Sequence, residues 1–368
     1  MYKEIPLGQL CHLKAGKFIS SSDISNLCTN ELYPCYGGNG VRGYVKTYTH
    51  EGSFPLIGRQ GALCGNISFA SGKFYATEHA VVVQPYEDVD IKWLYYLLTS
   101  MNLGQYATGA AQPGLSVSTL EKLVVCVPEK SLQKKLAKVF SNIDYMISIR
   151  KKQLAKLEEL VKSRFVELFG TIHDNKFGFD IVTLQEVSAP IKDGTHQTPT
   201  YTNDTKNGYK FLSSKDVTTG KIDWSNLKYI PEDLHQALYS RIAPRIGDIL
   251  LAKNGTTGIA AIVDRDEVFD IYVSLALIRP IGVNTTYLWA AINAPETKQQ
   301  FDASLKGIGV PNLHLGEIKK ARIILPPIER QEQFAAFVEQ TDKSKLAIQK
   351  SLEQLETLKK ALMQKYFG

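Results

Sequence analysis

An internal repeat limits the possible folds of this sequence more than any other feature. Shifting the 368-residue chain by 198 positions aligns residues 113–170 with residues 311–368 without a gap, and 15 of the 58 aligned pairs are identical. An ungapped match of this length indicates a duplicated unit. We therefore expect two copies of one architecture in a single chain. The identical pairs include Pro113/Pro311, Leu115/Leu313, Pro128/Pro326, Gln133/Gln331, Asp144/Asp342, Phe169/Phe367 and Gly170/Gly368.

The match weakens upstream of residue 113, where gaps are needed to extend it. One earlier pair of segments still corresponds, because LIGRQGALCG at 56–65 lies opposite LLAKNGTTG at 250–258. Each has the pattern of a buried strand that runs into a Gly-rich turn. The two halves therefore share one plan and have diverged before residue 113.

Both repeated segments have the pattern of a long helix. From residue 140 to residue 168, positions taken at alternating steps of three and four hold seven apolar residues out of nine, and no proline interrupts either copy. A run of about 39 residues would form a helix roughly 58 Å long, which is longer than a small domain is wide. We expect the two apolar stripes to pack on each other, although two surface helices, each docked on its own globule, would show a similar pattern. The predicted packing residues are Ile147, Leu154, Leu157, Val161, Ile348, Leu352, Leu355 and Leu362.

The segments that precede the helices are rich in short β-like runs broken by Gly, Asn and Pro, such as FPLIG, AVVVQP, DILLA and ARIILPP. Each segment also contains one short helical stretch, near IKWLYYLLTSM and TYLWAAINAPETKQQF. This mixture predicts the α+β class, with one mixed globule and one long helix in each half. The expected boundaries are 1–130 and 176–327 for the globules, and 131–175 and 328–368 for the helices.

The composition favours a cytoplasmic protein. The five cysteines show no CxxC spacing, which argues against a disulfide framework. A zinc site built from Cys28, Cys35 and a nearby His lacks paired-ligand spacing, so we predict no metal site. The first residues lack the apolar core of a signal peptide, and no apolar run reaches the length of a membrane span.

The formal net charge of +6 does not by itself indicate nucleic-acid binding. Residues 131–170 hold nine Lys/Arg against four Asp/Glu, and residues 328–368 hold seven against six, which leaves the rest of the chain neutral. Any phosphate-binding surface must therefore come from local segregation of charge on neutral globules.

The sequence contains no recognisable catalytic constellation. It has no GxxxxGK[ST] phosphate loop, no strand-linked GxGxxG, no GxSxG elbow and no HExxH. The Pro-Pro pair at 326–327 lacks the Asn or Asp and the aromatic residue of an adenine methyltransferase signature. Asp90-Ile91-Lys92 fits half of a nuclease motif but reads better as the polar start of the helix around Trp93. These absences predict a binding module without catalytic residues.

Two equivalent turns supply candidate contacts to a nucleic acid. Arg59-Gln60-Gly61 and Lys253-Asn254-Gly255 each place a cation and an amide at the end of a predicted hairpin, and Thr256 extends the second group. Arg and Lys can bind guanine or phosphate, whereas Gln and Asn can pair with adenine. Asn-Gly is also a preferred hairpin turn without any ligand, so it is the recurrence of the same order that favours a binding role.

Two further polar loops are particular to each half. The loop at 33–45, YPCYGGNGVRGYV, offers Tyr36, Asn39 and Arg42 among glycines that let a ligand approach the backbone. The loop at 191–204, IKDGTHQTPTYTND, offers side chains suited to phosphates and base edges. For any single one of these residues, an ordinary turn or loop role is favoured over a binding role. The candidates in this second loop are Lys192, Thr195, His196 and Thr198.

The whole chain resembles the specificity subunit of type I restriction-modification systems. The order globule–helix–globule–helix, the junction PPIERQEQF and the loops YPCYGGNGVRGY, GDILLAKNGTTG and IKDGTHQTP carry the resemblance. The first junction departs from the pattern, since it reads VPEKSLQKK where two prolines are usual. The resemblance implies two target-recognition domains, each reading one half of a bipartite asymmetric site in double-stranded DNA. It also implies that the two helices pair as an antiparallel coiled coil that sets the spacing.

The resemblance further implies that catalysis lies in partner subunits. Two methyltransferase subunits would dock on the helices, and restriction (translocase) subunits could join them. No cofactor is expected in this chain, and S-adenosylmethionine, ATP and Mg²⁺ would bind to the partners. Two alternatives remain open: a self-contained DNA-acting enzyme with an unfamiliar site, and a coiled-coil scaffold whose globules bind protein.

Overall fold

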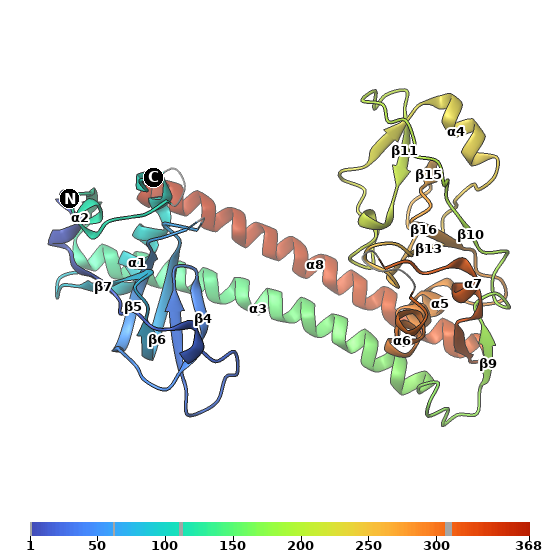
Figure 1. Cartoon of the computed structure of the whole chain (residues 1–368), viewed down its shortest axis with the longest axis horizontal. Coiled ribbons are helices and arrows are strands. Elements are labelled where there is room, and N and C mark those ends of the chain that lie inside the picture. The colour runs from blue at the N-terminus through green and yellow to red at the C-terminus, as the bar shows by residue number, and fades with distance from the viewer. Residues whose placement is uncertain (1, 62, 110–112, 306–310) are drawn as a thin grey trace. The chain divides into compact units, whose positions relative to one another are not determined.

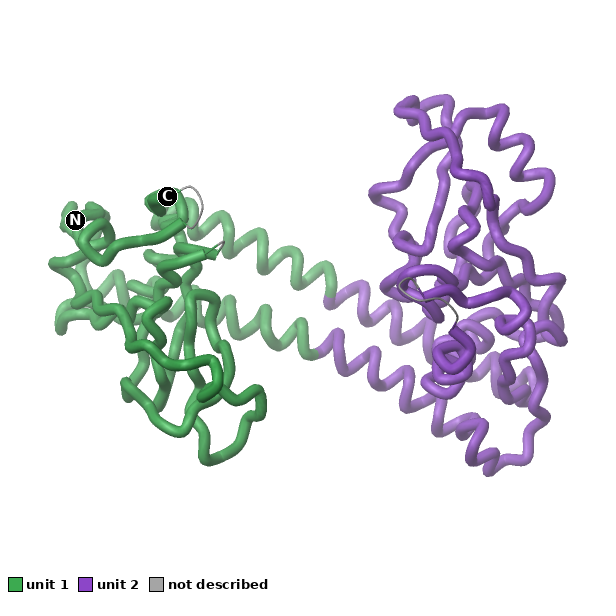
Figure 2. Tube along the Cα trace, in the orientation of Figure 1, with its two compact units in different colours: residues 1–152, 349–368 green, residues 153–348 purple. Residues whose placement is uncertain are grey.

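The structure, a computed structural model, describes residues 2–61, 63–109, 113–305 and 311–368. It divides into two compact units, which Figure 2 distinguishes by colour. Unit 1 consists of Met1–Lys152 and Gln349–Gly368, and unit 2 consists of Gln153–Ile348. Each unit therefore contains one globule together with parts of both long helices.

The two long helices are α3 (Lys130–Phe169) and α8 (Ile328–Phe367), each of 40 residues (Figure 1). Helix α3 ends at Phe169, before residue 175, because Gly170 adopts a left-handed φ of 74° that ends a helix at little cost. Among the described residues, no helix combines the length and the apolar composition needed to cross a membrane.

Unit 1 is built on a six-stranded sheet with the order β2-β7-β5-β6-β3-β4. A separate pair, β1-β8, joins the first strand to the segment that leads into α3. The short helices of this globule are α1 (Ile91–Ser100) and α2 (Val117–Glu121). The strands are β1 (Lys3–Pro6), β2 (Cys11–Ala15), β3 (Tyr33–Gly37), β4 (Gly40–Val45), β5 (His50–Gly58), β6 (Ile67–Ala76), β7 (Ala80–Pro85) and β8 (Val124–Val127).

Unit 2 contains a four-stranded sheet, β10-β16-β13-β14, a three-stranded sheet, β12-β11-β15, and the pair β17-β9. Its strands are β9 (Asp180–Thr183), β10 (Lys192–Asp193), β11 (Tyr209–Leu212), β12 (Lys228–Ile230), β13 (Ile249–Ala252), β14 (Ala260–Ile262), β15 (Phe269–Ile271), β16 (Leu275–Ile278) and β17 (Arg322–Leu325). Its short helices are α4 (Glu232–Tyr239), α5 (Thr285–Ile292), α6 (Pro295–Ala303) and α7 (Leu315–Lys320).

The duplication extends through both globules, including the region where the sequences have diverged. The order β2-β7-β5 in unit 1 matches β10-β16-β13 in unit 2, and the pair β3-β4 matches β11-β12. The long strand β6 links both parts of the first sheet, whereas its counterpart is divided into β14 and β15. This division makes one six-stranded sheet appear as two sheets in unit 2. The α+β class with an internal repeat is confirmed.

One pair of glycines shows how closely the two copies agree. A Cβ atom on Gly16 would lie 2.2 Å from the carbonyl oxygen of Ala76, and one on Gly194 would lie 2.0 Å from that of Ile271. No side chain fits at such distances, so both positions require glycine. The same close approach of backbones therefore occurs at the same place in each sheet.

In both units, the beginning of one long helix packs against the end of the other. In unit 1, the ring centroids of Phe140 in α3 and Phe367 in α8 are 5.5 Å apart, and Phe367 lies 6.4 Å from Trp93. In unit 2, Phe334 of α8 lies 5.6 Å from Phe169 of α3, which lies 4.8 Å from Tyr287. Each globule thus buries one aromatic cluster from α3, α8 and its own short helix.

The helices run antiparallel within each unit. In unit 1, Lys151 forms an ion pair of 3.1 Å with Glu356, whereas the earlier Asp144 pairs at 2.6 Å with the later Lys359. The eight predicted packing residues are all buried or half-buried. Val161, Leu352 and Leu355 are buried, and Ile147, Leu154, Leu157, Ile348 and Leu362 are half-buried.

The recurring Pro-x4-Gln spacing joins each long helix to its globule. Gln331 is only 1% exposed, and its amide donates to the carbonyl of Pro326 while its Oε1 accepts from the backbone N–H of Asn284. Asn284 is the N-cap residue of α5. Gln133 makes the same two bonds, to Pro128 and to Asp90, the N-cap residue of α1. The glutamine therefore fixes the start of the long helix against the start of the short one.

Gln331→Ala is expected to destabilise the protein by about 2–3 kcal/mol, because it leaves the half-buried N–H of Asn284 and the buried carbonyl of Pro326 without their partner. Gln333→Ala, at an exposed position of the same helix, should change stability by less than about 0.5 kcal/mol. Chemical denaturation of both variants measures the difference. Equal unfolding midpoints would show that the junction contributes nothing.

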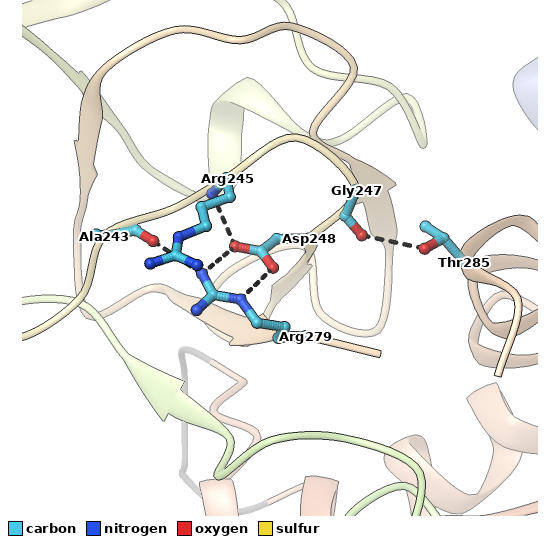
Figure 3. Close-up of polar contacts among 6 residues, drawn as sticks. All are labelled: Ala243, Arg245, Gly247, Asp248, Arg279 and Thr285. Atoms are coloured by element: carbon cyan, nitrogen blue, oxygen red, sulfur yellow. Dashed lines mark hydrogen bonds and ion pairs between the residues drawn. The ribbon is translucent and has the colours of Figure 1, made fainter. Parts of the chain in front are cut away.

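Unit 2 also contains an ion pair beside its four-stranded sheet, between the residue that precedes β13 and the residue that follows β16 (Figure 3). The carboxylate of Asp248, which is 2% exposed, accepts from Nε and Nη2 of Arg279 at 2.8 and 2.7 Å, and from the backbone N–H of Arg245 at 2.8 Å. Hydrogen bonding to Asp248 raises the pKa of Arg279, with burial acting in the opposite direction. Next to this pair, Thr285 of α5 donates to the carbonyl of Gly247. These bonds tie β13, β16 and α5 together.

Candidate functional site

The candidate site of unit 1 lies where β5 ends and the chain turns toward β6. The backbone N–H of Arg59 donates to the carbonyl of His79 at 3.0 Å, and the N–H of Gly61 donates to Pro113 at 3.1 Å. The side-chain oxygen of Gln60 lies 2.6 Å from Nδ1 of His79. Three separate segments therefore meet at this corner of the sheet: the β5–β6 connection, the β6–β7 turn and the strand-like residues near 114.

Unit 2 repeats the backbone bonds of this arrangement. The N–H of Lys253 donates to Ser274 at 2.9 Å, and the N–H of Gly255 donates to Pro311 at 3.3 Å. Gly61 and Gly255 both adopt left-handed φ values, 85° and 73°. The structure thus places Arg59-Gln60-Gly61 and Lys253-Asn254-Gly255 at equivalent positions of the two globules.

The side chain of Lys253 is not presented to solvent. Lys253 is 6% exposed, and its ammonium group lies 3.1 Å from Oδ2 of Asp193, which is itself 8% exposed. His196 reaches the same carboxylate oxygen at 3.3 Å. Arg241 donates to the backbone carbonyls of Asp193 and Gly194 and so holds this segment in place. The cation of Lys253 therefore already has a partner within unit 2.

The other candidates of unit 2 surround this ion pair or follow it in the chain. Lys192 is exposed and donates to the carbonyl of Arg241. Thr195 is buried, and its hydroxyl accepts from the N–H of Gln197. Thr198 and Thr256 are exposed. Lys192, Thr195 and His196 therefore gather beside Asp193, and Thr256 belongs to the neighbouring β13–β14 connection.

The remaining candidates of unit 1 lie around the β3–β4 hairpin. The side-chain oxygen of Asn39 accepts from the amide of Asn66 at 2.8 Å, which links the hairpin to the β5–β6 connection. Arg42 is exposed and donates to Ser21. Tyr36 packs edge-on against Phe74, and burial raises the pKa of its hydroxyl. The hydroxyl of Tyr36 therefore remains a hydrogen-bond donor at neutral pH.

Four polar residues that prove important at these corners were not among the sequence candidates: Glu78, His79, Asp193 and Asn312. Nothing in the local pattern singles out Glu78 and His79, because their closeness to Gln60 arises from the pairing of distant strands. Asp193 lies inside the quoted IKDGTH loop, and an acid beside several cations could have been considered there.

Among the residues that the structure describes, no group of three or more His, Cys, Asp or Glu side chains could hold a metal ion. Cys35 is buried, and burial raises the pKa of its thiol. The polar groups at the two corners are thus amides, carboxylates, hydroxyls and cations. Amides, hydroxyls and cations can bind phosphates, and all four kinds of group can bind the edges of bases.

Comparison with known proteins supports one family. The model of the type I restriction modification DNA specificity domain matches residues 1–159 and 179–359. An Escherichia coli protein, the type I restriction enzyme EcoprrI specificity subunit, is 47% identical over 143 residues, which are 39% of this chain and 36% of that protein. A Haemophilus influenzae protein described as a type I restriction enzyme specificity subunit is 25% identical over 92% of this chain and 90% of its own.

A solved structure has the same fold. The S subunit of a type I restriction-modification system from M. genitalium superposes with a TM-score of 0.65 at 15% identity, covering 100% of this chain and 96% of that one. The family model matches twice, once in each half of the repeat. The chain therefore belongs to the family of type I restriction-modification specificity subunits and carries two copies of its DNA specificity domain.

Proposed function

We propose that each unit reads one half of a bipartite, asymmetric site in double-stranded DNA. The observation that carries this proposal is the contrast between the two corners, which share one backbone and differ in their side chains. A shared backbone would present each corner to DNA in the same way, and unlike side chains would read unlike sequences. The proposed globule boundaries remain 1–130 and 176–327.

The long helices are proposed to set the distance between the two half-sites and to dock two methyltransferase subunits. Several apolar side chains on the helices are exposed, although each helix already has an apolar partner. Exposed apolar groups of this kind are typical of surfaces that bind other proteins. In α3 these residues are Val139, Tyr145, Met146, Leu160 and Val166, and in α8 they are Ile328, Leu346 and Leu358.

Catalysis is proposed to belong to the partners in a cytoplasmic complex. Relatives in this family are named as specificity subunits of type I restriction enzymes. Adenine methylation with S-adenosylmethionine would then occur in methyltransferase subunits. ATP-dependent cleavage with Mg²⁺ would require restriction subunits.

The test is to map methylated adenines in the source genome with and without the gene for this chain. Two short specific blocks separated by a fixed unread spacer should be methylated only when the gene is present. Identical methylation in both strains would reject the proposal. Methylation or cleavage of DNA by the purified chain alone would favour a self-contained enzyme, and a complex that binds no DNA at any salt concentration would favour a protein-binding scaffold.

A further inference from the structure

Four buried side-chain polar atoms in the described residues have no hydrogen-bond partner. They are Nε of Arg59, Oε2 of Glu78, Oδ1 of Asn254 and Oδ1 of Asn312. A buried polar atom without a partner destabilises the folded protein, so such atoms are rare and call for a physical reason.

All four atoms belong to the two equivalent corners. In unit 1, the backbone N–H of Arg59 is bonded to His79, the residue after Glu78. In unit 2, Asn254 forms an isolated bridge with Asn312, as Gln60 does with Gly114 in unit 1. The unsatisfied groups therefore gather at one place in each copy of the fold, although the residues that carry them differ.

These side chains can turn toward a ligand at low cost. The Glu78 side chain is 32% exposed, and Arg59, Asn254 and Asn312 are half-buried, so the groups lie just beneath the surface. An unpaired atom loses no hydrogen bond of its own when its side chain turns, and a bond to a ligand removes a penalty that exists in the free protein. In Glu78, only the 3.2 Å contact between Oε1 and His79 would have to adjust. By contrast, Lys253 would first have to leave Asp193, at 3.1 Å.

The chemistry of the atoms identifies the part of DNA that they fit. Three of the four are acceptors, and the phosphates of DNA offer acceptors only. The exocyclic amino groups of the bases are the donors that DNA presents in its grooves, on adenine N6 and cytosine N4 in the major groove. An unpaired acceptor at a DNA-binding surface therefore suits a base edge and does not suit the backbone. The Nε of Arg59 is a donor and could bond to either.

We infer that Glu78 in unit 1, and Asn254 with Asn312 in unit 2, accept hydrogen bonds from exocyclic amino groups of bases and so specify one position in each half-site. This inference rests on the proposed function. Equivalent backbone bonds align Glu78 with Val273 and Asn312 with Gly114. Asn254 aligns with Gln60, whose amide oxygen is already bonded to His79, so each unpaired acceptor is particular to its own unit. The two corners would then read different bases, which accounts for an asymmetric site.

The test uses the complex of this chain with its methyltransferase subunits and selects bound DNA from a pool in which both half-sites are randomised. Glu78→Gln keeps the shape of the side chain and its Oε1 contact with His79, but can replace the unpaired acceptor by a donor. It should lower the preference at one position of one half-site by about 5- to 100-fold and leave the other half-site unchanged. Glu51→Gln, at an exposed position of β5, is the matched control.

Asn312→Gly gives unit 2 the residue that unit 1 carries at the equivalent position, and should relax one position of the opposite half-site. Asn226→Asp, at an exposed position of unit 2, is its control. The melting temperature of Glu78→Gln should equal or exceed that of the wild type, whereas a structural role for the carboxylate would lower it.

Three results separate the possibilities. A wild-type complex that selects no bipartite site would reject the proposed function itself. A wild-type bipartite site that both variants retain at every position would reject only this inference. The inference would also be overturned if a variant bound all DNA sequences more weakly and its affinity depended less steeply on salt concentration. That behaviour indicates a contact to phosphate and not to a base.

Discussion

Leu157→Pro is expected to abolish co-purification of the chain with methyltransferase subunits. Leu157 is half-buried in the interior of α3, twelve residues before the helix ends at Phe169. Proline there removes a backbone hydrogen bond and clashes with the preceding turn, which costs about 3 kcal/mol or more. The effect should reach beyond the local turn, because the end of α3 supplies Phe169 to the aromatic cluster of unit 2.

Leu157→Ala is the matched control, since it removes apolar contact but preserves the helix. We expect this variant to assemble with a modest loss of stability. Pull-down with the methyltransferase subunit, together with the helical signal in circular dichroism, separates the two effects. A Leu157→Pro chain that assembles as well as Leu157→Ala would show that an unbroken α3 is not required for docking.

The sequence predicted the helices well because their pattern is local and repetitive. The 3-4 spacing located the apolar stripe, and all eight residues chosen from it lie buried or half-buried. The role of Gln133 and Gln331 could not be read in the same way. Their recurrence was visible, but their partners Asp90 and Asn284 lie more than forty positions earlier in the chain.

The candidate site was also harder to predict, because its contacts join residues that are far apart in the sequence. The sequence predicted Lys253 as a cation at the end of a hairpin that could contact a nucleic acid. In the structure it is buried against Asp193, which comes from another strand sixty residues away. Burial and pairing depend on strand order, which the diverged globule sequences do not reveal. The unpaired acceptors were even harder to predict, because the absence of a hydrogen-bond partner produces no pattern in the sequence.

Lengthening both long helices by one heptad is expected to lengthen the unread spacer of the DNA site. Duplicating residues 153–159 in α3 and 351–357 in α8 places the insertions at equivalent positions of the repeat. Both insertions lie close to the hydrogen bond of 3.2 Å that Nε of Arg150 donates to the hydroxyl of Ser351. Seven residues preserve the phase of the apolar stripe and add about 10.5 Å to each helix. At 3.4 Å per base pair, this corresponds to about three base pairs.

Three base pairs also rotate one half-site by nearly a third of a helical turn about the duplex. Selection from randomised DNA should therefore recover either a spacer about three base pairs longer or no bound site. A heptad inserted into α3 alone is the control, because unequal helices cannot keep both aromatic ends docked, and assembly should fail. Recovery of the original spacer with both helices lengthened would contradict the idea that the helices measure the site. The distance between the two half-sites would then have to be set within the globules, because these are unchanged between the wild-type chain and the chain with lengthened helices.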